Sequence, residues 1–254
     1  MKRSVLLVSL CALFVALSQC GLAQSRAVSG PERVSFKSGG ETVHGVLYRP
    51  SGAGPFPAIV VIHEWWGLNS WVKKQAVALA SHAYVVLALD LYQGKVAKVA
   101  SQARNLKRAL PTDRAIGELK AAFAYLAGRL DVDPKRIGAL GWSMGGGLAL
   151  RLAIHEPRLA ACVVNYGSLP TKRADIRQIN AQTLGIFGAR DRGISPIKVR
   201  AFEKSMNAAK KSVEIKTYDD AGHAFENPAN VHGYRPQAAN DAWLRTLMFL
   251  GRSL

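Results

Sequence analysis

The sequence predicts an α/β protein with a mixed, mostly parallel sheet and helices on both faces. From about residue 57 onward, strand-like and helix-like segments alternate, which is typical of a doubly wound sheet. Several strand-like segments are apolar almost throughout, as central strands of a parallel sheet are. Two alternating segments around Ser38-Gly39-Gly40 precede them and predict an antiparallel hairpin at the amino-terminal end.

Each expected element occupies a defined range. The hairpin strands are residues 33–36 and 43–48, and the later strands are residues 57–63, 84–89, 136–141, 160–166, 183–187 and 213–218. The spacing of apolar residues predicts helices over residues 71–81, 113–130, 148–155, 196–209 and 238–250. No repeat, low-complexity block or long linker interrupts this order, so we expect residues 24–254 to form a single domain.

Residues 1–23 have the features of a secretory signal peptide. Lys2 and Arg3 precede an apolar stretch, residues 5–17, and Gly21-Leu22-Ala23 offers a small-residue cleavage site. The apolar stretch is too short to span a membrane, and no later segment is long and apolar enough to do so. We therefore expect a periplasmic or secreted protein without a membrane span.

The three cysteines limit the covalent links that the chain can form. Cys11 and Cys20 fall within the expected signal peptide, so residues 24–254 retain only Cys162 and cannot form an intramolecular disulfide. Cys162 lies in an apolar run, where a buried thiol is expected. A lipoprotein is the alternative, because the residues before Cys20 approach a lipidation motif, although Gln19 is bulky for that motif.

The chain carries 34 Lys and Arg against 17 Asp and Glu, a net charge of +17. Lys2 and Arg3 account for two of the positive charges, which leaves +15 for residues 24–254. The cations are spread along the chain, so they predict a solvated basic surface and do not favour nucleic-acid binding. The charge leaves open a basic extracytoplasmic binding protein built on an inactive enzyme scaffold.

Gly141-Trp142-Ser143-Met144-Gly145 is the most informative motif. It follows a predicted strand and precedes a predicted helix, the context in which G-x-S-x-G forms a nucleophile elbow. The glycines allow a strained turn that lifts the Ser143 hydroxyl clear of the sheet. We therefore expect Ser143 to be a catalytic nucleophile; the alternative is a glycine-rich turn that carries an idle serine.

A serine nucleophile needs a histidine base, and His223 is the expected one. His223 lies on a glycine-containing loop after the last predicted strand, at the edge where open α/β sheets collect their active sites. His155 lies about three turns along the helix that the elbow opens, which is too far from Ser143. His232 remains a weaker alternative.

The base in turn needs an acid, and Asp191 is the expected one because it follows the end of a predicted strand. In this topology the acid and then the histidine follow the serine along the chain, which is the order found here. Asp219 and Asp220 are closer to His223 in the sequence. Acids in such turns more often accept hydrogen bonds from the backbone, so these two remain alternatives.

The segment after residues 57–63 is expected to complete the reaction site. An oxyanion intermediate needs two backbone N–H donors, one after the nucleophile and one from this loop, and we expect Met144 and Trp65 to supply them. His63 and Glu64 do not form an H-E-x-x-H motif, because a glycine stands where the second histidine belongs. No other cluster has ligand spacing, so neither a metal ion nor another cofactor is expected.

Five motifs, in this order, resemble the dienelactone hydrolase family of α/β-hydrolases. They are residues 63–69 (HEWWGLN), 88–94 (ALDLYQG), 141–146 (GWSMGG), 188–191 (GARD) and 218–225 (YDDAGHAF). The resemblance covers nearly all of residues 24–254. It implies an α/β-hydrolase fold and a carboxylic ester hydrolase.

Two residues depart from what the resemblance implies. The family's typical nucleophile is cysteine, with the loop glutamate contacting the resting thiol, whereas this chain has Ser143 with Glu64 in that loop. Glu64 is therefore expected to be an auxiliary residue that orients Ser143 or the loop, or a remnant without a role. The dienelactone-cleaving members hold the substrate carboxylate with arginines, one of them four residues after the histidine, and Asn227 stands there. The sequence therefore does not predict activity on dienelactone itself.

Together, these features predict a secreted serine hydrolase that cleaves small carboxylic esters or lactones through an acyl-enzyme. We expect it to act as a monomer. A peptide or amide hydrolase is the alternative among enzymes, because the same triad serves peptidases on related folds. Trp65 and Trp66 either wall an apolar pocket or are core aromatics, and residues 93–97 and 227–234 are expected to shape the substrate site.

Overall fold

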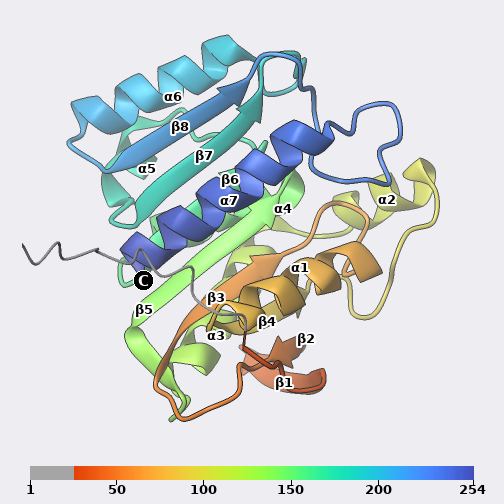
Figure 1. Cartoon of the computed structure of the whole chain (residues 1–254), viewed down its shortest axis with the longest axis vertical. Coiled ribbons are helices and arrows are strands. Elements are labelled where there is room, and N and C mark those ends of the chain that lie inside the picture. The colour runs from red at the N-terminus through yellow and green to blue at the C-terminus, as the bar shows by residue number, and fades with distance from the viewer. Residues whose placement is uncertain (1–25) are drawn as a thin grey trace, which may run out of the picture.

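The computed structural model describes residues 26–254, which form an eight-stranded sheet with helices on both faces (Figure 1). The predicted signal peptide, with Cys11 and Cys20, lies outside the described residues. The strands are β1 (Glu32–Ser38), β2 (Glu41–Tyr48), β3 (Phe56–Ile62), β4 (Val85–Asp90), β5 (Val132–Trp142), β6 (Ala161–Asn165), β7 (Gln182–Gly188) and β8 (Val213–Tyr218).

The strand order across the sheet is β1-β2-β4-β3-β5-β6-β7-β8. β1 pairs with β2, and β2 with β4, in antiparallel fashion, whereas all other neighbours are parallel. The prediction of a mixed, mostly parallel sheet with an amino-terminal hairpin is therefore confirmed. Within residues 26–254, no helix is long and apolar enough to cross a membrane.

Helices cover the sheet from both sides. They are α1 (Ser70–Ser81), α2 (Ala100–Arg108), α3 (Thr112–Ala127), α4 (Met144–His155), α5 (Arg173–Gln178), α6 (Pro196–Ala208) and α7 (Pro236–Ser253). Figure 1 is seen from the side of α1 and α7, which enclose one apolar core, while α3, α4, α5 and α6 enclose the other. Cys162 is fully buried in the second core, as expected, and its burial raises the pKa of the thiol.

Two helices, α2 and α5, were not predicted from the sequence. Each contributes a single fully buried residue, Ala103 in α2 and Ile176 in α5, so neither shows the apolar spacing of a core-facing helix. Helix α4 also begins at Met144 rather than near residue 148. Glycine is a poor helix former, but here residues 145–147 let the helix approach the strands closely. A side chain at Gly145 would collide with the end of β3.

The carboxyl ends of the parallel strands meet at one edge of the sheet. The segments that leave β3, β5, β7 and β8 at this edge carry Glu64, Ser143, Asp191 and His223, in that order. Four chemically active side chains that are far apart in the sequence are therefore carried to the same edge.

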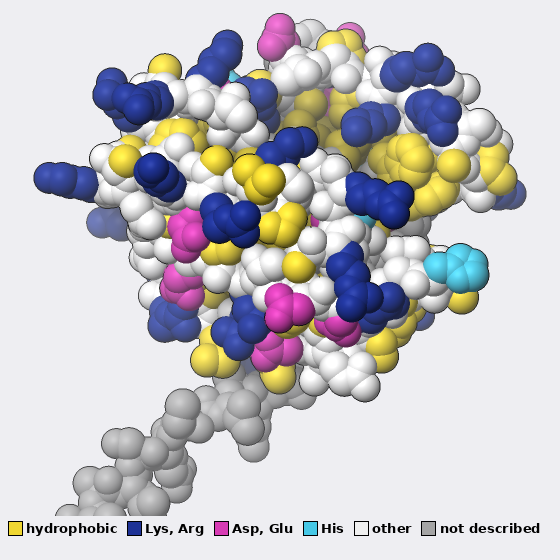
Figure 2. All heavy atoms as spheres, turned by 90° about the horizontal axis from the view of Figure 1, so that it is seen from above, with side chains coloured by type: hydrophobic (Ala, Val, Ile, Leu, Met, Phe, Trp, Pro, Cys, Tyr) yellow, Lys and Arg dark blue, Asp and Glu magenta, His cyan; other side chains and the backbone are white. Residues whose placement is uncertain are grey.

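On the face that Figure 2 shows, Lys and Arg side chains are spread over the surface rather than gathered in one block.

Candidate active site

Ser143 occupies the sharp turn between β5 and α4. Its backbone angles, φ 52° and ψ −111°, lie in a region that residues with a side chain rarely adopt. Its amide donates a hydrogen bond to the Asn165 carbonyl (2.9 Å), and its own carbonyl accepts one from the Gly147 amide (3.1 Å). A side chain at Gly141 would collide with the backbone of Gly145 across the turn. The glycines flanking Ser143 thus make the strained turn possible.

Two hydrogen bonds join Ser143, His223 and Asp191 into a chain. Ser143 Oγ lies 2.8 Å from His223 Nε2, and His223 Nδ1 lies 2.7 Å from Asp191 Oδ2. The imidazole is 45% exposed, whereas the Asp191 side chain is 1% exposed. With its proton on Nδ1, the imidazole donates to Asp191 and leaves Nε2 free to accept from the hydroxyl.

The turn after β7 supplies Asp191 with further donors. The amides of Gly193 and Ile194 both donate to Oδ1, at 2.8 and 3.0 Å, while His223 donates to Oδ2. Burial by itself raises the pKa of the carboxyl group, but these three hydrogen bonds and the nearby imidazole outweigh burial and lower the pKa. Asp191 is therefore an ionised carboxylate at neutral pH.

The alternative residues considered from the sequence take no part in the two hydrogen bonds that link Ser143, His223 and Asp191. His155 ends α4 and is exposed, and His232 is exposed on the loop before α7. Asp219 and Asp220 are also exposed, in the turn after β8. Within residues 26–254, no hydrogen bond joins these four side chains to His223 or Ser143.

Trp65, in the loop after β3, and Met144, at the start of α4, border the turn that carries Ser143. Met144 is the first residue of α4, so its amide has no earlier helical turn to donate to. The Trp65 amide lies in the loop after β3 and donates no hydrogen bond to another backbone group of the described chain. Gly145 packs against the carbonyls at the end of β3, which brings the two segments together. Both amides are thus available as donors beside Ser143.

His63 holds the loop after β3 in place through two hydrogen bonds of its ring. It is fully buried, its Nδ1 donates to the Glu64 carbonyl (2.6 Å), and its Nε2 accepts from the Leu91 amide (3.3 Å). Desolvation lowers the pKa of His63, so the ring is neutral. Both ring nitrogens are therefore engaged. Among the residues that the structure describes, no group of three His, Cys, Asp or Glu side chains could hold a metal ion.

Glu64 contacts Asn227, not Ser143, in the hydrogen bonds of the described chain. Glu64 is 2% exposed, and its Oε2 accepts a hydrogen bond from Asn227 Nδ2 (2.7 Å). Desolvation raises the pKa of Glu64 to about 7, against smaller lowering effects of Asn227 and His223. Glu64 thus links the loop after β3 to the loop between β8 and α7 that carries His223, here called the histidine loop.

Glu226, which was not predicted from the sequence, is a second carboxyl group shielded from water. Its Oε2 accepts a hydrogen bond from Trp142 Nε1 (2.9 Å), and its Oε1 is buried without a partner within residues 26–254. Burial raises the pKa of Glu226 to about 8, helped by the charge of Glu64 and opposed by the bond from Trp142. An acid three residues after His223, between Phe225 and the amide at 227, was the available signal.

A cavity of about 520 Å³ opens over Ser143 and His223. Trp65 and Trp66 line it, with their rings in edge-to-face contact 5.1 Å apart, so they are pocket walls rather than core aromatics. Lys107, from α2, also lines the cavity. Lys107 was not predicted to line the cavity, because α2 itself was not predicted from the sequence. The cavity has the size of a small-molecule site.

The sequence profile of the dienelactone hydrolase family matches residues 43–254. The chain belongs to the dienelactone hydrolase family. A Bradyrhizobium relative, named provisionally as a 2-oxo-3-(5-oxofuran-2-ylidene)propanoate lactonase, is 33% identical over 85% of this chain and 92% of its own length. A Methylorubrum extorquens relative, named provisionally as a carboxymethylenebutenolidase, is 28% identical over 96% of this chain and 90% of its own length.

Solved structures of dienelactone hydrolase relatives have the same architecture. A dienelactone hydrolase-like promiscuous phosphotriesterase from metagenomic libraries superposes with a TM-score of 0.81 at 25% identity, over 89% of this chain and 99% of that chain. An acetyl xylan esterase from Thermoanaerobacterium, at 17% identity and a TM-score of 0.63, shares the fold alone. This member of the dienelactone hydrolase family is a carboxylic ester hydrolase with the α/β-hydrolase fold.

Proposed function

We propose that this chain cleaves small carboxylic esters or lactones through an acyl-enzyme formed on Ser143. The observation that carries the proposal is the chain of two short hydrogen bonds from Ser143 through His223 to Asp191, on the floor of a small-molecule cavity. A hydroxyl is a weak nucleophile at neutral pH, and a base within hydrogen-bond distance activates it. His223 Nε2 is at that distance.

The reaction follows from this arrangement in two halves. His223 accepts the Ser143 proton as Oγ attacks the ester carbonyl, and the carboxylate of Asp191 stabilises the imidazolium that forms. The oxyanion accepts hydrogen bonds from the amides of Trp65 and Met144. His223 then gives its proton to the departing alkoxide, and a water molecule, activated by the same imidazole, releases the acid.

We assign Glu64 a positioning role. Its carboxyl group holds Asn227 at 2.7 Å, and through it the loop that carries Trp65 is tied to the loop that carries His223. Both loops wall the substrate cavity. A carboxyl group with a pKa of about 7 carries only part of a negative charge near His223 at neutral pH, so Glu64 disturbs the imidazole less than a fully ionised acid would.

The substrates we propose are small, because the cavity of about 520 Å³ is comparable to sites for drug-sized or smaller ligands. A lactone is one member of this class, and the name of the Bradyrhizobium relative refers to a lactonase. We further propose that residues 24–254 act as a single, monomeric domain in the periplasm or medium after removal of residues 1–23. The amino-terminal sequence of the exported protein tests that removal.

Turnover of aryl esters by the purified protein and by Ser143→Ala tests the proposed function. We expect the parent to hydrolyse 4-nitrophenyl acetate, and the variant to lose at least about a thousandfold in kcat. The thermal unfolding midpoint of the variant serves as the control for folding. A folded Ser143→Ala protein with the activity of the parent would exclude the serine mechanism. An amide of matched structure should react far more slowly than the ester, whereas similar rates would favour a peptide or amide hydrolase.

A further inference from the structure

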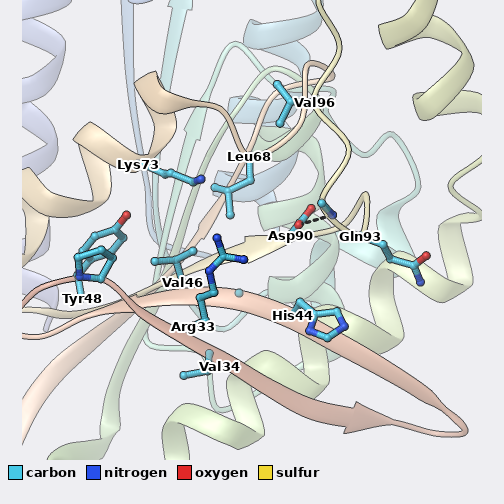
Figure 3. A pocket seen from close by; sticks show the side chains of 13 residues that line it. Arg33, Val34, His44, Val46, Tyr48, Leu68, Lys73, Asp90, Gln93 and Val96 are labelled. Atoms are coloured by element: carbon cyan, nitrogen blue, oxygen red, sulfur yellow. Dashed lines mark hydrogen bonds between the residues drawn. The ribbon is translucent and has the colours of Figure 1, made fainter.

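A second cavity, of about 480 Å³, lies beside the amino-terminal hairpin (Figure 3). Helix α3 packs on β1 from one face of the sheet, while α1 packs on β4 and β2 from the other. The cavity opens beside α1 and is walled by β1, β2 and the segments that follow β3 and β4. No residue lines both this cavity and the one over Ser143. The proposed catalytic function therefore does not account for it.

Two cations from different elements enter this second cavity. Arg33 extends from β1 and Lys73 from the first turn of α1, and Figure 3 shows both side chains directed into the same space. Neither forms an ion pair with a carboxylate of residues 26–254. Two unpaired cations on opposite walls of one cavity attract an anion.

Tyr48, on β2, adds a third polar group to the wall of the cavity. Most of the residue is buried, and its hydroxyl can donate a hydrogen bond into the cavity. Figure 3 shows this hydroxyl turned toward the space that Arg33 and Lys73 enter. A ligand oxygen in the cavity would accept a hydrogen bond from this hydroxyl.

The carboxylate that lines the cavity is engaged by the backbone. Asp90 Oδ1 accepts a hydrogen bond from the Tyr92 amide (3.1 Å), and Oδ2 accepts one from the Gly94 amide (2.6 Å). Asp90 therefore closes the turn after β4 and is not paired with either cation. Two positive charges face one negative charge, which leaves the cavity positive.

We propose that this cavity is a second binding site, for a small organic carboxylate with an apolar body. Arg33 and Lys73 bind the carboxylate, since a guanidinium matches its two oxygens, and Tyr48 donates a further hydrogen bond. Val46 and Leu68 offer apolar contact for the remainder of the ligand. The volume suits a molecule of this kind.

Calorimetric titration of the purified protein with benzoate tests this site. We expect benzoate to bind with a Kd of roughly 1 mM or tighter, and benzamide, which lacks the charge, to bind at least about tenfold more weakly. Inorganic phosphate should also bind more weakly than benzoate, because it makes no apolar contact. Arg33→Gln combined with Lys73→Gln should weaken benzoate binding by at least about tenfold, and Tyr48→Phe by about threefold.

Two sets of control substitutions distinguish binding in this cavity from binding elsewhere on the protein. Arg200→Gln with Lys204→Gln removes the same charge from exposed positions on α6, near the opposite edge of the sheet, and should leave benzoate binding unchanged. Lys107→Gln alters the cavity over Ser143 and should also leave benzoate binding unchanged. Loss of binding in Lys107→Gln alone, equal losses in both double variants, or no benzoate binding at about 10 mM would each overturn the proposal.

Discussion

Two buried acidic regions flank the Ser143 and His223 pair, and their carboxyl groups behave in opposite ways. Asp191, in the turn after β7, has a lowered pKa. Glu64 and Glu226 lie near the elbow and have pKa values raised to about 7 and about 8. All three carboxyl groups are removed from water, so burial alone does not account for the difference.

The two glutamates are more deeply desolvated than Asp191, and they also have fewer hydrogen-bond donors. Among the residues that the structure describes, Asp191 accepts from His223 and from two backbone amides, whereas Glu64 accepts only from Asn227 and Glu226 only from Trp142. Three donors stabilise an ionised carboxylate against desolvation, and one neutral donor does not. In addition, the charge of one glutamate disfavours ionisation of the other. Asp191 therefore carries a negative charge at neutral pH, whereas Glu64 and Glu226 are at least partly protonated.

The largest expected effect comes from Asp191→Asn, which removes the negative charge from the turn after β7. That turn then carries an uncharged side chain, as the region near the elbow does when Glu64 and Glu226 are protonated. An amide at this position cannot stabilise the imidazolium and lets His223 adopt the wrong tautomer. We expect kcat for an aryl ester to fall by about 10³ to 10⁴, with little loss of binding. Asp219→Asn, an exposed neighbour of the histidine in the sequence, is the matched control and should retain activity within about twofold. Comparable losses in both variants would mean that Asp191 is not the acid.

A smaller effect is expected on stability when Glu64 becomes glutamine. The folded-state pKa of about 7 lies above the ordinary value of 4.5. The stability that Glu64 contributes is therefore fully present below about pH 4.5 and lost as pH rises through about 7. Over that range the parent should lose about 2 to 3 kcal/mol more free energy of unfolding than Glu64→Gln.

Urea unfolding at acidic and mildly alkaline pH measures this difference. The glutamine at 64 keeps an oxygen that accepts from Asn227, so only the ionisation is removed. Glu214→Gln changes an acid that is 57% exposed and should retain the pH dependence of the parent. If Glu64→Gln and the parent lose stability equally as pH rises, Glu64 is already ionised in the folded protein and the comparison fails.

The smallest effect concerns the bond between Glu226 and Trp142. Glu226→Leu removes the acceptor of the buried indole N–H, which loosens the histidine loop against the elbow, so kcat/KM should fall by about tenfold. Glu226→Gln keeps an acceptor oxygen and should stay within about twofold of the parent. Equal losses in kcat/KM for these two variants would show that the charge of Glu226 matters rather than its hydrogen bond.

The fold was largely predictable because long apolar segments identify the strands of a parallel sheet. Helices α2 and α5 were not, since a helix with one buried residue leaves no periodic pattern. The start of α4 was also misplaced, because the three glycines at its beginning are selected by close contact with the strands and not by helix propensity. Only the packed structure reveals that contact.

The candidate residues Ser143, His223 and Asp191 were predictable because each lies in a recognisable motif at a strand end. Their proximity followed from the parallel sheet, which carries such ends to one edge. Glu226 was not predictable, because its significance depends on Trp142, 84 residues away in the chain. Lys107 belongs to the cavity only through α2, whose position the sequence pattern does not give.

Mass-spectrometric mapping of the residue that a fluorophosphonate modifies tests the central claim most directly. Such reagents phosphonylate a serine hydroxyl that a neighbouring base activates. We expect one adduct, on Ser143 within the tryptic peptide of residues 137–151, in the parent protein, and none in Ser143→Ala. Modification of a different residue, or an unmodified Ser143 in a protein that still hydrolyses esters, would contradict the account.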